Sequence, residues 1–105
     1  MQSDFYKDLF APFGYITTRK MFGTDGFYCD GLFFAIVADG ELWLKADDTT
    51  RATFEEAGAE QYVYRMQKKP APLPYYRAPE DIFDEDDSLR FWTQMALEAA
   101  SRSRK

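Results

Sequence analysis

The longest uninterrupted apolar stretch of the chain runs from Leu32 to Ala38. Side chains of a strand point alternately to opposite faces of a sheet. Strict alternation divides the stretch into two apolar sets: Leu32, Phe34 and Ile36 on one face, and Phe33, Ala35 and Val37 on the other. An antiparallel strand with one face in water would alternate apolar with polar residues. We therefore expect a central strand that is covered on both sides.

Three Asp-Gly pairs, at positions 25–26, 30–31 and 39–40, interrupt this part of the chain. Asp-Gly readily adopts the positive φ angles that tight hairpin turns require, so the pairs predict an antiparallel meander. We expect the first pair to close a turn from Gly23 to Gly26. The strands expected around the turns are Ile16 to Phe22, Phe27 to Cys29, Leu32 to Ala38, and Glu41 to Ala46.

Three segments with apolar residues at helical spacing predict helices. They are a short N-terminal segment carrying Phe5, Tyr6, Leu9 and Phe10, a second from Thr50 to Ala57, and a third from Ser88 to Arg102. Asp47 or Asp48 is expected to cap the second helix. Two further short strands are expected, from Gln61 to Arg65 and from Leu73 to Arg77. Strands and helices segregated in this way indicate an α+β two-layer domain.

Composition favours one soluble domain over residues 1–105, with residues 101–105 as a frayed tail. Of the 105 residues 46% are hydrophobic, which is ample for a core. No apolar run approaches the ~20 residues of a membrane span, and the N-terminus lacks a signal-peptide pattern. A single cysteine allows no internal disulfide, so we expect a cytoplasmic protein. The net charge of −5 disfavours indiscriminate binding to nucleic acid.

The residue types that carry most catalysis are scarce. The chain has no histidine, one cysteine, and none of the glycine-rich phosphate motifs or nucleophile elbows. The carboxylates Asp47 and Asp48, and the acidic block from Glu80 to Asp87, are better explained as caps and a solvated helix start. Cys29, beside an aromatic and an acid, is expected to be an ordinary half-buried thiol. We predict no enzyme, no metal site and no cofactor.

Two surfaces are candidates for binding. Trp43 alternates with Leu42 and Leu44 and so points away from them, which makes it either covered by the chain or part of an interface. The first candidate, for a homodimer or a protein partner, consists of Phe33, Val37 and Trp43. The second, a basic face for nucleic acid, consists of Arg19, Lys20, Arg65, Lys68, Lys69 and Arg77.

Four tyrosines surround part of the basic set, at positions 62, 64, 75 and 76. Aromatic rings beside basic residues can stack the bases of a single-stranded nucleic acid. The alternative explanation, which we favour, is that two strands use these rings for packing.

Several runs of the sequence resemble the N-terminal domain of the TfoX/Sxy family, named for regulators of bacterial competence genes. The resemblance extends from about Leu9 to about Ala100. The matching residues are Arg19 to Gly23, Gly26 to Ala35, Leu42 to Lys45, Arg51, Phe54, Gly58, Tyr75, Tyr76 and Pro79. The full-length regulators carry a second, C-terminal domain beyond the part that this sequence matches.

The resemblance implies a two-layer α-β(3)-α-β(2)-α fold with an antiparallel sheet, similar to type III secretion chaperones, which act as dimers. It brings no catalytic residues. The leading hypothesis is a non-enzymatic cytoplasmic interaction module accessory to transcriptional regulation. The second is a nucleic-acid-binding regulator that uses the basic face. The third is a small enzyme, which would need a deep pocket holding a carboxylate with a raised pKa.

Overall fold

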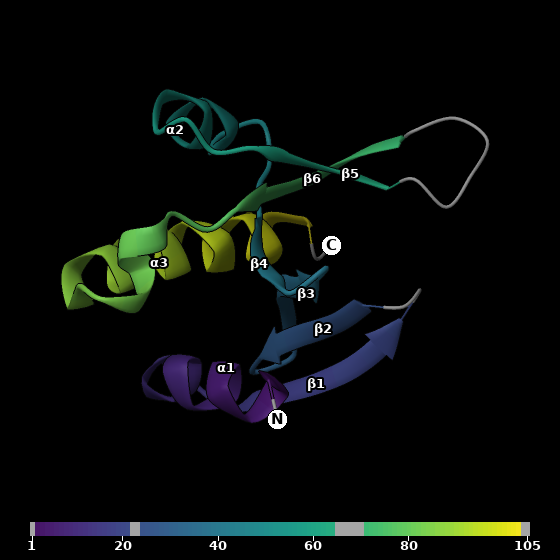
Figure 1. Cartoon of the computed structure of the whole chain (residues 1–105), viewed down its shortest axis with the longest axis vertical. Coiled ribbons are helices and arrows are strands. Elements are labelled where there is room, and N and C mark those ends of the chain that lie inside the picture. Colours follow the sequence, from purple (N-terminus) through teal and green to yellow (C-terminus); the bar gives the residue numbers. More distant parts are fainter. Residues whose placement is uncertain (1, 22–23, 65–70, 104–105) are drawn as a thin grey trace.

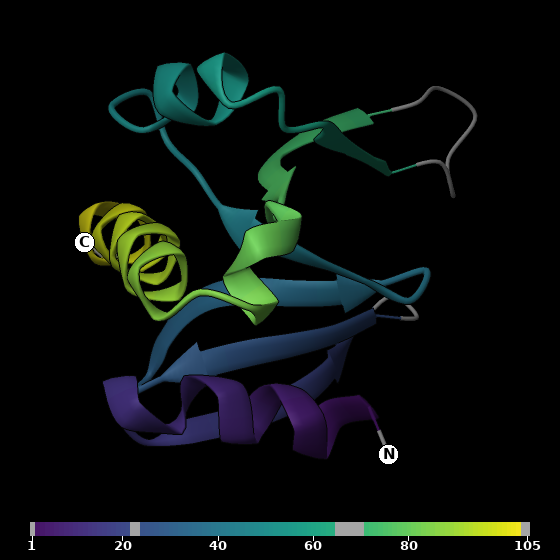
Figure 2. The same ribbon diagram turned by 60° about the vertical axis from the view of Figure 1, so that its left-hand side comes forward.

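A six-stranded antiparallel sheet carries all the helices on one face in the computed structural model, which describes residues 2–21, 24–64 and 71–103 (Figures 1 and 2). The elements are α1 (Gln2–Phe10), the 3₁₀ helix η1 (Ala11–Phe13), β1 (Ile16–Met21), β2 (Thr24–Cys29), β3 (Leu32–Ala38), β4 (Glu41–Lys45), α2 (Arg51–Glu56), β5 (Gln61–Tyr64), β6 (Ala71–Arg77), the 3₁₀ helix η2 (Glu80–Phe83) and α3 (Asp86–Ser103). No helix of the described part is long and apolar enough to cross a membrane.

The strand order is β1-β2-β3-β4-β6-β5, which confirms the α+β fold with an antiparallel sheet. β1 to β4 form a meander, and β6 joins beside β4 with β5 outside it. Four strands precede α2, as the Asp-Gly pattern predicts, where the resemblance implied three. The strand from Leu32 to Ala38 lies between β2 and β4, so its central position is confirmed.

Two of the three predicted turns are present. Asp30 and Gly31 have φ angles of 50° and 85°, and Asp39 and Gly40 have φ angles of 54° and 76°, the sign that a type I′ hairpin requires. The turn predicted from Gly23 to Gly26 is wrong. Gly26 lies inside β2, where it is buried and pairs with a strand on each side, so ladder hydrogen bonding outweighs the local turn preference. Residues 22–23, which connect β1 to β2, lie outside the described residues.

An irregularity in β3 breaks the strict alternation expected from the sequence. Phe27 lies opposite Ala35, but the next residue of β2, Tyr28, lies opposite Phe33. Phe34 is therefore the extra residue of a β-bulge. As a result Phe34 and Ala35 both pack into the core on the helical side, and Val37 follows them. Ile36 packs on the other side with Phe33, so the predicted face assignments of Ala35, Ile36 and Val37 are wrong.

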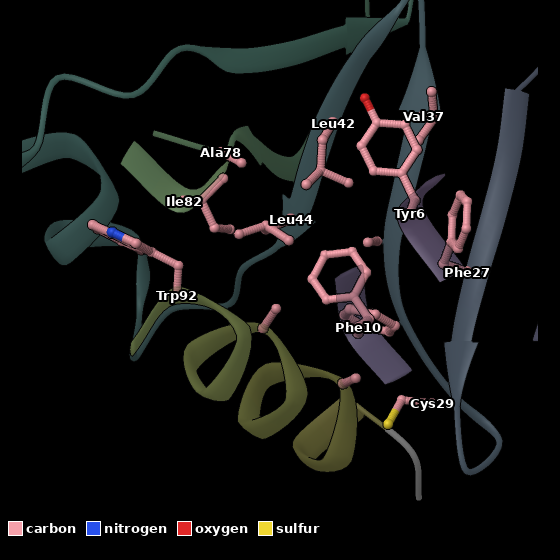
Figure 3. Packing of buried hydrophobic residues seen from close by; sticks show 14 of the residues in the cluster. Tyr6, Phe10, Phe27, Cys29, Val37, Leu42, Leu44, Ala78, Ile82 and Trp92 are labelled. Carbon is pink, nitrogen blue, oxygen red and sulfur yellow. The ribbon is translucent and has the colours of Figure 1, made fainter. Parts of the chain in front are cut away.

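Aromatic rings fill the core between the sheet and the helices. Phe10 of α1 meets Phe34 edge-on at 4.9 Å between ring centres. Phe54, the buried residue of α2, lies 5.3 Å from Tyr76 and 4.8 Å from Trp92. Figure 3 shows Leu44 of β4 pointing toward Phe10 in the same cluster. The three helices thus attach to one continuous apolar cluster.

The opposite face of the sheet is covered by its own side chains. The buried members of this second cluster are Ile36, Ala38, Trp43, Tyr62 and Tyr75. Trp43 points away from Leu42 and Leu44, as predicted, and meets Tyr62 edge-on at 4.9 Å. Its indole Nε1 donates a hydrogen bond to the backbone oxygen of Ala38 at 3.3 Å. Side chains of β5 and β6 therefore cover a face for which no helix is available.

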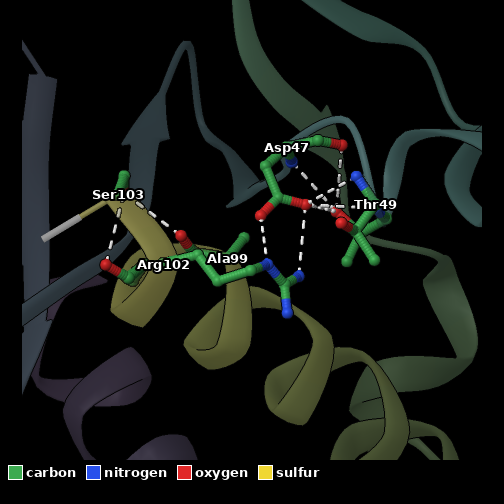
Figure 4. A network of polar contacts seen from close by, with 7 residues as sticks. Asp47, Thr49, Ala99, Arg102 and Ser103 are labelled. Carbon is green, nitrogen blue, oxygen red and sulfur yellow. Dashed lines mark hydrogen bonds and ion pairs between the residues drawn. The ribbon is translucent and has the colours of Figure 1, made fainter.

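A polar clamp fastens the end of α3 to the loop before α2 (Figure 4). The carboxylate of Asp47 accepts hydrogen bonds from the backbone N–H groups of Thr49 and Thr50, both at 3.1 Å, and so closes the turn that precedes α2. The predicted cap by Asp47 or Asp48 is wrong, because the N-cap residue of α2 is Thr50 and the helix has no side-chain capping hydrogen bond. The same carboxylate accepts two hydrogen bonds from Arg102, at 2.6 and 3.2 Å. The tail expected to fray from position 101 is helical through Ser103, and residues 104–105 lie outside the described residues.

Removing the Phe34 side chain is expected to destabilise the fold strongly. Phe34 is fully buried at the bulge, so Phe34→Ala leaves a cavity and should cost about 3–5 kcal/mol of unfolding free energy. Phe91→Ala is a matched control, because Phe91 is 50% exposed. Urea denaturation followed by circular dichroism measures both, and an unchanged midpoint for Phe34→Ala would remove that residue from the core.

The Asp47 clamp is expected to make stability depend on acidic pH. The hydrogen bonds from Arg102, above all, lower the pKa of Asp47 from 3.8 to about 2. A carboxyl whose native pKa is depressed stabilises the fold above its unfolded pKa, and the contribution is lost as the pH falls through the native value. Asp47→Asn should therefore be less stable than the wild type at neutral pH, and the difference should shrink between pH 4 and pH 2.

Denaturation with urea at a series of pH values measures this difference. Asp48→Asn is the matched control, because Asp48 is almost fully exposed and pairs only with exposed Arg51. A difference between Asp47→Asn and the wild type that stays constant down to pH 2 would contradict the clamp.

Candidate interaction surface

A groove of about 310 Å³ opens where α1, the β3–β4 turn, the end of α2 and the β6–η2 connection meet. We call it the groove. Its lining residues are Tyr6, Gly40, Glu41, Leu42, Ala57, Gly58, Ala59, Glu60, Arg77, Ala78, Pro79, Glu80 and Phe83. Backbone hydrogen bonds of 2.9 Å, from Arg77 to Glu60 and from Ala78 to Leu42, tie its walls together. The groove therefore lies at the ends of elements that the sheet holds in place.

Arg77 forms one wall of the groove and contacts two carboxylates and an indole ring, whereas its Nε is buried without a hydrogen-bond partner among the described residues. Its register partner on β4 is Trp43, and the guanidinium lies 5.4 Å from the centre of that indole ring. One guanidinium nitrogen lies 3.2 Å from a carboxylate oxygen of Glu41 and 2.9 Å from one of Glu60. The two carboxylates offset the charge of Arg77, which weakens its attraction for a phosphate backbone.

Two exposed phenylalanines form a ridge beside the groove. Phe5 of α1 is 53% exposed and Phe83 of η2 is 42% exposed. Their ring centres lie 6.0 Å apart, and both rings contact Tyr6, at 5.1 and 6.3 Å. We call Phe5 and Phe83 the aromatic ridge. Phe5 was expected on the apolar side of its helix. Nothing in the sequence places Phe83 beside it, since the contact joins α1 to η2, two elements far apart in the chain.

Acidic side chains dominate the charge around the ridge. The groove contains three carboxylates, of Glu41, Glu60 and Glu80, against the single guanidinium of Arg77. Burial, and then the charge of Glu41, raises the pKa of the Tyr6 hydroxyl, which therefore stays protonated at neutral pH. The ridge thus stands beside a groove in which negative charge is in excess.

The acidic block itself matches its predicted role as a helix start. Asp86 and Asp87 lie in the first turn of α3, and Glu80 and Asp81 in the first turn of η2. Asp81 accepts a hydrogen bond of 2.6 Å from the hydroxyl of Ser88. Among the described residues, no group of three or more acidic or cysteine side chains is arranged to hold a metal ion.

Phe33, Val37 and Trp43, the surface expected for a dimer, do not all lie on one face of the sheet, because Phe33 and Trp43 belong to the second cluster and Val37 to the first. Val37 is buried on the helical side of β3, as a consequence of the bulge. Trp43 is only 5% exposed, beneath Tyr62 and Arg77. Phe33 is partly buried on the second face. The homodimer stays a prediction, but these three residues do not form a common exposed surface for it.

The basic residues are dispersed as well. Arg19 and Lys20 are exposed on β1, at one edge of the sheet, whereas Arg77 belongs to β6, next to the other edge. Arg65, Lys68 and Lys69 lie outside the described residues. A contiguous basic face is therefore not assembled by the described members of the set.

The tyrosines proposed as a stacking platform are mostly packed. Tyr62, Tyr75 and Tyr76 are buried, and burial raises the pKa of Tyr75 to about 12. Tyr76 stacks on Phe54 and donates a hydrogen bond of 2.8 Å to Glu55. The side chain of Tyr64 is outside the described part. Packing by two strands, the favoured explanation, accounts for the three that are described.

The remaining reactive groups are enclosed. Cys29 is 2% exposed, its thiol donates to the backbone oxygen of Phe13 at 3.4 Å, and burial raises its pKa. The ammonium of Lys45 lies 5.7 and 5.2 Å from the ring centres of Phe33 and Tyr75, and burial lowers its pKa. The ammonium of Lys45 also donates a hydrogen bond of 3.5 Å to the hydroxyl of Tyr75, a buried member of the second cluster. The groove, beside which exposed aromatic rings stand, is our candidate for a functional site.

Comparison with known proteins gives a consistent result. Residues 8–100 match the family of the TfoX N-terminal domain. The chain is 28% identical over 92 residues to the DNA transformation protein TfoX1 of Aliivibrio fischeri, covering 88% of this chain and 44% of that protein. It is 27% identical over 98 residues to protein Sxy of Escherichia coli, covering 93% of this chain and 47% of that protein. The chain thus spans about half the length of these relatives.

Proposed function

This chain belongs to the TfoX N-terminal domain family, and we propose that it is a non-enzymatic regulatory module of DNA transformation that acts by binding another protein. The observation that carries the proposal is the family match itself, because it spans the sheet, α2 and α3 together and not a local motif. The named function of the relative in A. fischeri, DNA transformation, supplies the process.

The aromatic ridge beside the groove supports a protein-binding mode. Exposed aromatic side chains in contact with each other are enriched in protein interfaces and often carry much of the binding energy. Phe5 and Phe83 are held by separate elements that the fold brings together, and neither is needed to fill the core. A partner that covers the ridge would therefore bury apolar surface without disturbing the sheet.

The chemistry of the ionisable groups also favours a binding module over an enzyme. Each described group with a clearly shifted pKa owes the shift to burial or to a neighbour that serves packing or capping.

A chimera tests the proposed function. This chain would replace the matched region of A. fischeri TfoX1, and the frequency of transformation would be measured in a strain lacking the native protein. We expect the chimera to restore transformation, and Phe5→Ser with Phe83→Ser to lower the frequency at least about tenfold by removing the interface anchors. Phe91→Ser, an equally exposed phenylalanine on α3, should leave the frequency unchanged. A folded chimera that does not restore transformation would refute the proposed process.

Nucleic-acid binding is expected to be weak and unselective. The net charge is −5, Arg77 is engaged, and Arg19 and Lys20 stand apart from it. Any affinity should be micromolar or weaker and fall steeply with salt, because it would rest on a few phosphate contacts. Fluorescence anisotropy with labelled duplex and single-stranded oligonucleotides measures this, with Arg19→Ala and Lys20→Ala as comparisons. Sub-micromolar, sequence-selective binding at physiological salt would instead establish the basic-face hypothesis.

A further inference from the structure

We infer that the groove and its aromatic ridge bind a cationic segment of a partner protein, through an apolar side chain flanked by lysine or arginine. The inference rests on the proposed protein-binding function and adds the chemistry of the partner. The ridge indicates the apolar side chain of the segment, and the carboxylates around the groove indicate its positive charge.

The apolar anchor follows from the geometry of the ridge. Phe83 lines the groove, and the ring of Phe5 lies 6.0 Å from it, outside the lining. Buried Tyr6 contacts both rings from below, so the two exposed rings form one aromatic surface beside the groove. The groove volume of about 310 Å³ is at the small end of the range for small-molecule sites. That space suits one large side chain inserted from an extended segment.

The positive charge of the segment follows from the carboxylates that the fold leaves without a counter-ion. Arg77 already pairs with Glu41 and Glu60. Glu80, which also lines the groove, forms no ion pair with any described residue, and neither do the exposed carboxylates of Asp4 and Asp84 next to the ridge residues. A lysine or arginine beside the anchor would meet this excess negative potential, which favours encounter and selects the partner.

The same charges argue against a second copy of this chain as the occupant. A two-fold dimer through the ridge would place each patch against itself. Glu80, Asp4 and Asp84 of one copy would then face those of the other, and like charges across an interface oppose association. A different protein with a basic segment fits the surface better.

Peptide binding to the full chain tests the inference. The probe is a fluorescein-labelled six-residue peptide with a Phe-Leu centre between Lys-Arg pairs. Its comparisons are a peptide with a Ser-Ser centre between the same pairs and a peptide with the same Phe-Leu centre between Glu-Asp pairs. We expect anisotropy to detect the first peptide, with a dissociation constant at least about tenfold lower than for either comparison, and with weaker binding at higher salt.

Two variants locate the binding. Phe83→Ser and Glu80→Lys should each raise the dissociation constant several-fold, whereas Phe91→Ser and Glu98→Lys, exposed positions on α3, should not change it. Circular dichroism checks that each variant is folded. Shifts of amide resonances on peptide addition should gather at residues 40–42, 57–60 and 77–83.

Several results would overturn the inference. One is that the serine-centred or the acidic peptide binds as tightly as the basic Phe-Leu peptide. Others are that Phe83→Ser binds the basic peptide as tightly as the wild type, or that the resonance shifts lie away from the groove. Self-association in sedimentation velocity that Phe83→Ser abolishes would assign the ridge to a second copy instead. Peptide binding at the groove together with an inactive chimera would refute the role in transformation but not the chemistry of the partner. An active chimera without peptide binding at the groove would refute the chemistry of the partner alone.

Discussion

Burial of β3 on both faces is the constraint on which the rest of the structure depends. A strand that is apolar on each side needs two covers, and the helices supply only one of them. The bulge at Phe34 decides which side chains of β3 face each cover. It turns Phe34 and Ala35 toward the helices and places Ile36 on the other face. The aromatic residues of β4, β5 and β6 then form a second, smaller cluster, which covers the face that no helix covers.

This arrangement determines which aromatic residues remain for binding. Trp43 and Tyr75 are used to close the second face, and Phe10, Phe54 and Trp92 to attach the helices. The ridge residues lie outside both clusters, on short helices at the margin of the helical layer. Because their exposure does not weaken either cluster, they are the aromatic pair that the fold can offer to a partner, beside carboxylates that the sheet edge holds in place.

Polar and ionisable groups mostly serve to join elements. Asp47 closes the turn before α2 and holds Arg102 of α3, Tyr76 reaches Glu55, and Arg77 links the β3–β4 turn to the segment before β5. These contacts fix distant parts of the chain to each other. In this domain, which has no histidine, charged side chains mainly connect one element to another. Glu80 is an exception, because it forms no ion pair with any described residue.

The sequence by itself determined the features that depend on neighbouring residues. It predicted the turns at Asp30-Gly31 and Asp39-Gly40, the long last helix and the buried central strand, because φ preference and periodicity act within a few positions. The candidate site was largely missed. Gly26 became part of a strand because strands paired on both sides of it, and Val37 changed face because of a bulge at Phe34. Phe5 and Phe83 met because the fold places α1 beside η2, two elements far apart in the chain. Pairing and packing between residues far apart in the chain decided each of these outcomes, and local sequence preferences carry no information about such contacts.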